Sequence, residues 1–172
     1  TGEPLEEAIV WQCGRASGIA QEIAEQGHAE EIREATGLQL SAYFPAAKMA
    51  WLLRNGGEER QKRAADGKLC LGTIDSWLVY KLTGDHAFKT DFSNASRTQL
   101  FNLKTLAWDE KICEMFRIPV CALARVCDSD AVYGTTTMEG LFSEPVPICG
   151  VLGDSHAALF GQGCLKPGMI KA

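Results

Sequence analysis

The chain has 172 residues, of which 46% are hydrophobic and 23% charged, a balance that is typical of a globular domain and excludes intrinsic disorder. The formal net charge of −5 argues against a nucleic-acid partner, because a phosphate backbone attracts basic surfaces. No apolar run approaches the roughly 20 residues that span a bilayer, so we expect no membrane partner.

Seven cysteines are present, and no two of them have Cys-x-x-Cys spacing. Most lie in apolar stretches, which predicts reduced core cysteines in a cytoplasmic protein. The three histidines are not spaced to complete a zinc site with them. The first seven residues are polar and acidic, unlike a signal peptide.

Strands and helices alternate along the chain, which predicts an α/β fold. In chain order we expect a strand at 8–12 and helices at 17–36, 46–54 and 58–66. A strand at 70–73, a buried helix at 74–82 and strands at 86–92 and 98–103 follow. We then expect a helix at 108–116, a buried strand at 146–152, a helix at 155–160 and a strand from 169 to 172. Gly37 is a natural stop for the first helix, and Pro45 a natural start for the second. Residues 121–126 fit either class, and 93–96, 128–134 and 135–143 are expected to be loops or connections.

The Gly153-Asp154 pair carries the first functional signal. A carboxylate at the end of a buried strand, beside the start of a helix, is where open α/β sheets place catalytic groups. Gly-Asp-Ser is equally common as a strand-to-helix turn in which Asp or Ser caps the helix. The residues alone leave these two interpretations about equal.

A second cluster spans residues 43–55, where Tyr43 stands just before the proline-started helix. Its hydroxyl could reach a polar ligand while its ring packs. Lys48 and Trp51 share one face of that helix. An amphipathic helix with a packed aromatic cap would explain the same residues without any ligand.

The third cluster, residues 90–98, is dense in hydrogen-bonding side chains. Such a loop can line a pocket, but side chains of this kind also bind the backbone locally. We expect a satisfied structural turn for most of its members.

Together these segments resemble the FGGY carbohydrate kinases. The match at Tyr43 to Asn55 is position by position, and Trp11-Gln12-Cys13, the Asp91 to Arg97 loop, Val132-Tyr133-Gly134 and Gly153-Asp154 follow in the family's order. Within the family the chain is most similar to the glycerol kinases, on the Trp-Gln-Cys run and the Asn-Ala-Ser-Arg-Thr loop.

The resemblance implies part of a ribonuclease-H-like domain with the actin-like ATPase fold. It also implies transfer of the γ-phosphate of ATP, with Mg²⁺, to a hydroxyl of a small polyol or sugar. Asp154 would then be the general base. Trp11 would pack on the carbon skeleton of the substrate, Tyr43 would hydrogen-bond a hydroxyl, and Ser155, next to the base, would also contact the substrate.

The chain departs from the glycerol kinase pattern beside the base. Those enzymes usually carry Gln-Gln there, whereas this chain has Ser155-His156. Serine is shorter than glutamine, so the pocket could admit a longer polyol or a sugar such as a pentulose. His156 is either a donor behind the site or simply a residue on the helix face.

On the same resemblance, residues 1–172 are part of an N-terminal FGGY domain. The family's upstream phosphate loop and its C-terminal domain are absent from this sequence. Most of the ATP site would then lie outside it, and the resemblance assigns no metal ligand within it. Unpaired sheet edges would favour self-association into a homo-oligomer. Two alternative interpretations remain. The chain is an inactive fragment that serves only as a folding or interaction module, or it is a non-sugar member of the actin-like superfamily.

Overall fold

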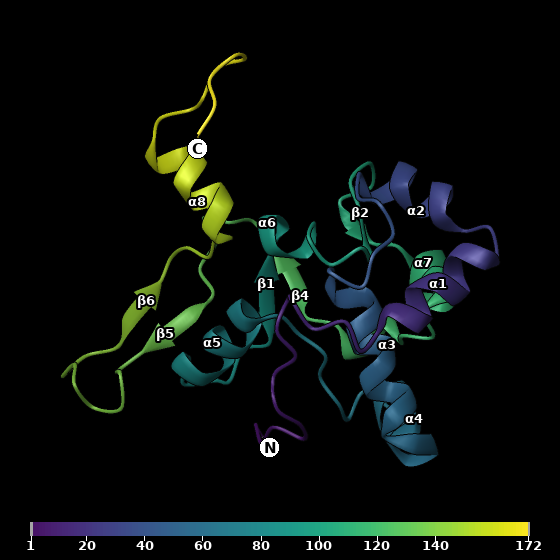
Figure 1. The fold of residues 1–172 in the computed structure, drawn as a ribbon. Coiled ribbons are helices and arrows are strands. Elements are labelled where there is room, and N and C mark those ends of the chain that lie inside the picture. The colour runs from purple at the N-terminus through teal and green to yellow at the C-terminus, as the bar shows by residue number, and fades with distance from the viewer. Residues whose placement is uncertain (1, 172) are drawn as a thin grey trace.

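Helices and short strands alternate along residues 2–171, the part of the chain that the computed structural model describes (Figure 1). Three two-stranded sheets form: β1 with β4, β2 with β3, and β5 with β6. Only the first pair is parallel. The mixed helix and strand content confirms the predicted α/β class.

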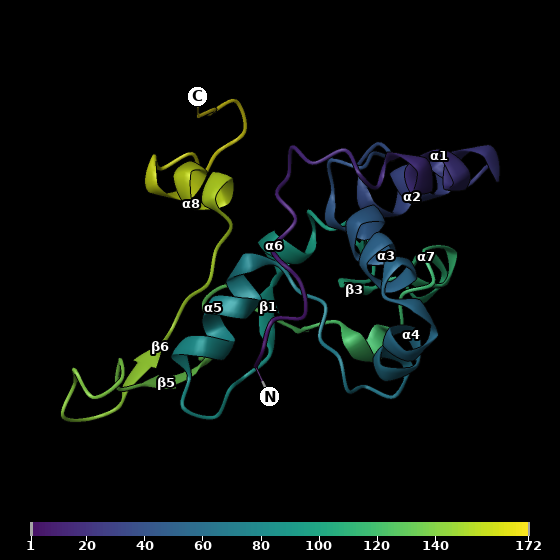
Figure 2. The same cartoon turned by 60° about the horizontal axis from the view of Figure 1, so that its bottom comes forward.

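The main hydrophobic core lies among the helices on one side of the molecule (Figures 1 and 2). These are α1 (Ser17–Glu25), α2 (Ala29–Thr36), α3 (Pro45–Asn55), α4 (Gly57–Ala65) and α7 (Glu110–Met115). Ile23, Leu53, Ile112 and Phe116 are buried there, each contributing about 1.5–3 kcal/mol through lost contact with water. This core fixes α3 and hence the segment that precedes it.

The centre of the molecule holds α5 (Ile74–Leu82), β1 (Lys89–Asp91), the short helix α6 (Phe92–Ala95) and β4 (Arg125–Cys127). Lys89 pairs with Arg125 and Asp91 with Cys127. The connection between the two strands contains β2 (Phe101–Asn102), β3 (Ala107–Trp108), α7 and the 3₁₀ turn η1 (Val120–Ala122).

The last third of the chain extends away from this body. The hairpin of β5 (Gly134–Thr136) and β6 (Val146–Ile148) is followed by α8 (Asp154–Gly161), and both views show α8 apart from α3 (Figures 1 and 2). None of the α8 residues is buried. The position of Asp154 therefore depends on the few contacts of the segment before it.

Three predicted elements are wrong. Residues 8–12 form no strand, and no described strand pairs with them. The helix expected at 17–36 is two helices, because Gly27 adopts a φ of +86° between them; Gly37 does end the second, with a φ of +72°. The strand at 70–73 is reduced to one bridge between Leu71 and Leu123.

Other boundaries shift more modestly. The strands expected at 86–92 and 98–103 shorten to β1 and β2, and the helix at 108–116 becomes β3 followed by α7, with Asp109 capping the helix. The loop at 93–96 belongs largely to α6, and the connection at 135–143 begins as β5. Residues 169–171 are not a strand, and residue 172 lies outside the described part.

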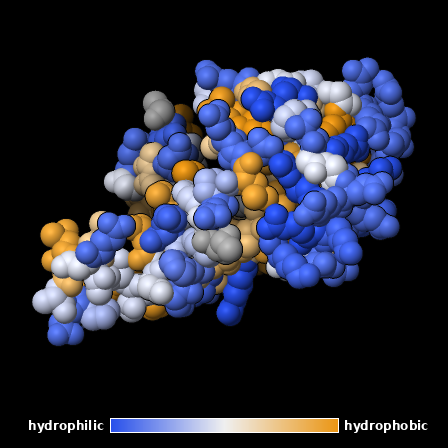
Figure 3. Space-filling model, turned by 90° about the horizontal axis from the view of Figure 1, so that it is seen from below, coloured by the Kyte–Doolittle hydropathy of each residue, from blue (hydrophilic) through white to orange (hydrophobic). Residues whose placement is uncertain are grey.

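The burial of two elements differs from prediction. The helix at 74–82 forms, but Asp75, Ser76 and Val79 are its buried residues, whereas Trp77, Leu78 and Leu82 are exposed. The strand at 146–152 is only β6, and Val146 at its start is exposed. Seen from below, apolar residues reach the surface in separate patches among polar ones (Figure 3).

Candidate active site

Trp11 and Tyr43 come together at the start of α3. Their rings meet edge to face with centroids 5.5 Å apart, and each side chain is at least half exposed. Phe44 adds a second edge-to-face contact to Tyr43, at 5.0 Å. This gives an open aromatic wall with one phenolic hydroxyl, which suits a ligand that has both C–H faces and hydroxyl groups.

Lys48 links the two aromatic segments through their backbone carbonyl groups. Its side chain is 5% exposed, and its ammonium donates to the carbonyl oxygens of Trp11 (3.3 Å), Tyr43 (2.8 Å) and Ala42. Burial lowers the pKa of this ammonium. Lys48 thus fixes the irregular N-terminal segment to α3, a role that the sequence pattern did not reveal.

Two arginines stack on aromatic rings of residues 44–51, and one of these rings, Phe44, belongs to the wall. The guanidinium of Arg97 lies over the ring of Phe44 at 5.0 Å, and that of Arg15 lies over Trp51 at 5.0 Å. Arg15 also donates to the Cys13 sulfur at 3.0 Å, and hydrogen bonds from its backbone and side chain lower the pKa of that thiol. One positive charge, that of Arg97, therefore lies against the Phe44 ring of the wall.

Asp154 and Ser155 form the first turn of α8, and both are exposed. The backbone N–H of Ser155 donates to Asp154 Oδ1 at 2.6 Å. Gly153 is the N-cap and no side chain caps this helix, so the predicted capping role of Asp or Ser is wrong. The Asp154 carboxylate is left facing solvent at the N-terminus of α8.

Asp154 does not follow a buried strand directly. Residues 149–153 separate it from β6, and Gly153 has ordinary extended torsions (φ −60°, ψ 143°), so no sharp glycine turn is needed there. Within residues 2–171, no hydrogen bond or aromatic contact joins Asp154 or Ser155 to Trp11 or Tyr43. The structure thus places Trp11 beside Tyr43, and Asp154 beside Ser155, as two separate pairs.

The Asp91 carboxylate is the most heavily hydrogen-bonded group near α8. It is fully buried and accepts from the backbone N–H groups of Ser93 and Asn94, from both of their side chains, and from the Ser129 hydroxyl. Burial disfavours its ionised form, but these hydrogen bonds outweigh burial and hold its pKa below the usual range. The prediction that this loop is a satisfied structural turn is confirmed for these residues.

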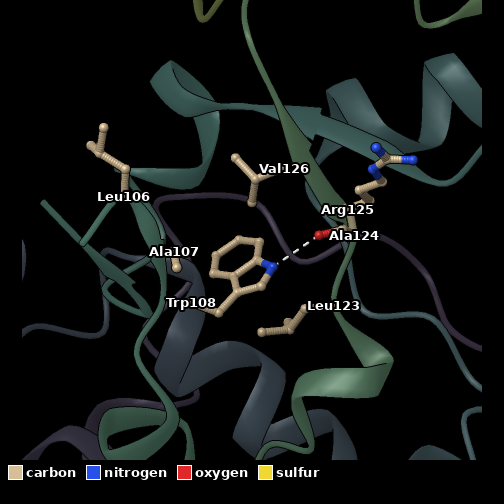
Figure 4. A pocket seen from close by; sticks show the side chains of 7 residues that line it. All are labelled: Leu106, Ala107, Trp108, Leu123, Ala124, Arg125 and Val126. Carbon is tan, nitrogen blue, oxygen red and sulfur yellow. Dashed lines mark hydrogen bonds between the residues drawn. The ribbon is translucent and has the colours of Figure 1, made fainter.

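A shallow depression of about 390 Å³ lies elsewhere, beside β3 and β4. Trp108 lines it and donates through Nε1 to the carbonyl oxygen of Ala124 at 2.9 Å (Figure 4). Arg125 is its one charged lining residue, and it contains none of the predicted site residues. The predicted site residues thus lie outside this depression, at the aromatic wall and at the N-terminus of α8.

The described residues contain no cluster of three or more histidine, cysteine or carboxylate side chains that could hold a metal ion. They also contain no helix long and apolar enough to cross a membrane. All seven cysteines are free, but only Cys113 is buried, so the prediction of core cysteines is wrong for Cys70 and Cys149, which are exposed.

Residues 1–161 match the family model for the N-terminal domain of the FGGY family of carbohydrate kinases. The chain is 51% identical over 172 residues to a glycerol kinase of Geobacter sp. (strain M21) and 47% identical over 171 residues to one of Stenotrophomonas maltophilia (strain R551-3). These alignments cover 100% and 99% of this chain and 34% of each relative. The chain thus spans about a third of the length of these relatives.

Solved structures agree with the sequence matches. A crystal structure of Plasmodium falciparum glycerol kinase with ADP superposes with a TM-score of 0.88 at 34% identity, covering 95% of this chain and 32% of that one. A ligand-bound xylulose kinase from Lactobacillus acidophilus gives a TM-score of 0.79 at 25% identity, covering 94% of this chain and 32% of that one. The actin-like ATPase fold of these sugar kinases is the fold predicted for this chain. The chain belongs to the FGGY family of carbohydrate kinases.

Proposed function

We propose that this chain forms part of the N-terminal domain of an ATP-dependent kinase that phosphorylates a hydroxyl of a small polyol, with glycerol as the first candidate. The observation that carries the proposal is the similarity to glycerol kinases along the whole chain, at 47% and 51% identity. The open aromatic wall of Trp11 and Tyr43 supports a polyol substrate.

In this proposal the chain's own residues bind and activate the substrate. Trp11 packs on its C–H face, Tyr43 hydrogen-bonds one hydroxyl, and Ser155 contacts another. Asp154 accepts the proton of the attacking hydroxyl as that oxygen bonds to the γ-phosphorus, while the bond from phosphorus to the departing ADP oxygen breaks. An exposed carboxylate suits this step, since it can pass the accepted proton on to water.

ATP would supply the phosphoryl group, with Mg²⁺ neutralising its phosphates. The described residues contain no cluster of three or more metal-ligating side chains, and Asp91, Ser93 and Asn94 hydrogen-bond one another rather than facing a phosphate. We therefore assign no nucleotide or metal ligand among residues 2–171. We propose that residues beyond it hold both groups, and that the chain is inactive alone.

A second candidate is a sugar kinase that acts on a pentulose. Ser155 favours it, because a short, exposed side chain beside the base leaves room for a longer substrate. The similarity in fold to xylulose kinase is compatible with this candidate. The free thiols support a cytoplasmic location for either enzyme.

The experiment that tests the proposal is a panel of polyols and sugars assayed with ATP and the full-length protein. We expect ADP release that depends on glycerol or on another small polyol. Release that depends only on a pentulose would replace the first candidate with the second. The absence of release with every polyol and sugar would overturn the proposal.

A further inference from the structure

The segment that leads into Asp154 is tied to the α6 turn by one hydroxyl group. Ser93 Oγ accepts a hydrogen bond from the backbone N–H of Gly153 at 2.7 Å. The same hydroxyl donates to Asp91 Oδ2 at 2.5 Å. Ser93 is 8% exposed, so water has little access to compete for these bonds.

The carboxylate fixes the direction of that hydroxyl. An ionised carboxylate can only accept, so Ser93 must point its proton at Asp91 and its lone pair at Gly153. Asp91 Oδ2 also accepts from the Ser129 hydroxyl at 2.6 Å, and the Ser129 carbonyl accepts from the backbone N–H of Val151 at 3.0 Å. Ser93 and Ser129 both donate to Asp91 Oδ2, and they accept hydrogen bonds from the backbone N–H groups of Gly153 and Val151, respectively.

The Gly153 backbone also lies close to the side chains of Ser93 and His156. A Cβ placed on Gly153 would lie 3.3 Å from Ser93 Oγ and 3.3 Å from His156 Nδ1. Close approach to Ser93, rather than an unusual backbone conformation, thus accounts for glycine at this position.

These ties matter because α8 has little else to hold it. None of its residues is buried, and Asp154 is its first residue. We propose that Asp91 and Ser93 are positioning residues that set the place of the Asp154 carboxylate through the backbone of Gly153. This inference rests on the proposed role of Asp154 as general base. A small displacement of a base from the attacking hydroxyl costs up to about 100-fold in rate.

The test uses Ser93→Ala in the full-length protein, with Ser93→Thr to restore the hydroxyl and Ser96→Ala as matched control. The Ser96 hydroxyl lies on the same turn and donates to the Ser93 carbonyl oxygen at 2.8 Å, without contacting Gly153. We expect Ser93→Ala to lower kcat by about 10-fold to 100-fold with KM for the polyol nearly unchanged, and Ser93→Thr to recover most of the loss. An unchanged kcat, or an equal loss in Ser96→Ala, would overturn the inference.

Amide hydrogen exchange separates this inference from the proposed function. Ser93→Ala should accelerate exchange of the Gly153 amide whether or not the protein turns over substrate. Unaltered exchange there would contradict the hydrogen bond between Gly153 and Ser93. Asp154→Asn, measured in parallel, addresses only the base. An Asp154→Asn protein with normal turnover would overturn both the base and the positioning role, whereas an inactive one beside a fully active Ser93→Ala would overturn the positioning role alone.

Discussion

The rings of Trp11 and Tyr43 meet edge to face at 5.5 Å, although Trp11 lies in an irregular segment and Tyr43 at the start of α3. Lys48 donates to the backbone carbonyls of both. The aromatic wall is thus held by the backbone of its two segments as well as by ring contact. Its side chains can face solvent without losing their relative position.

Removing the larger ring of this wall should weaken substrate binding. Trp11→Ala should raise KM for the polyol by about 10-fold or more, because about 1.5–3 kcal/mol of apolar contact is lost. Trp11→Phe keeps a ring and should raise KM much less. Steady-state kinetics of the full-length protein would check this, and equal KM values for the alanine variant and the wild type would contradict a substrate role for Trp11.

Lengthening the residue beside the base should change substrate preference. Ser155→Gln should raise the ratio of kcat/KM for glycerol to that for xylulose by about 10-fold, which is what one added contact of about 1.4 kcal/mol gives. The longer side chain reaches a small substrate and crowds a long one. Ser155→Ala serves as the control for loss of the hydroxyl, and an unchanged ratio in Ser155→Gln would count against the contact.

The thiols should differ widely in reactivity. Hydrogen bonds from Arg15 lower the pKa of Cys13, whereas burial raises the pKa of Cys113 to about 12. Because the thiolate is the nucleophile, iodoacetamide at pH 7 should label Cys13 fast and leave Cys113 unlabelled in the folded protein. Mass spectrometry would measure both rates, with unfolded protein as the control. Equal labelling rates in the folded protein would contradict this account.

The buried Asp91 carboxylate should make stability depend on pH. Its pKa is lowered in the folded protein, so its contribution is complete above the unfolded value of about 3.9 and is lost as pH falls from there through the folded value. Asp91→Asn should lower the free energy of unfolding by about 1–3 kcal/mol at pH 7, because hydroxyl and amide donors lose a charged acceptor. The loss should shrink below pH 4.

Urea unfolding of the full-length protein at several pH values would measure this difference. Glu30→Gln is the matched control, since its carboxylate also has a lowered pKa, through a hydrogen bond from Arg33, but is exposed. We expect its effect to be much smaller. A difference between wild type and Asp91→Asn that stays constant with pH would contradict the assignment.

The sequence predicted α3 and its aromatic neighbour well, because Pro45 marks the start of the helix and local signals suffice there. It did not predict the buried face of α5, whose residues are apolar on more than one side. Periodicity then cannot tell which side packs: the short side chains Asp75 and Ser76 are buried, and Trp77 faces outward.

The hydrogen bonds made by Lys48 and Asp91 could not be predicted from the sequence, for a different reason. Lys48 and Asp91 each act on residues far along the chain, Lys48 on Trp11 and Asp91, through Ser93, on Gly153. A lysine on a helix and an aspartate before a short turn both look solvent-exposed in a sequence. Only the packing of α3 and β1 shows that both side chains are buried.

The most direct test of the account is the turnover of Asp154→Asn in the full-length protein, with ATP and the best polyol of the panel. Asparagine keeps the shape of the side chain but cannot accept the proton as a base. We predict a loss of kcat of about 10²- to 10⁴-fold, the usual contribution of a positioned general base, with ATP binding unchanged. A variant that retains near wild-type turnover would contradict the assignment of Asp154.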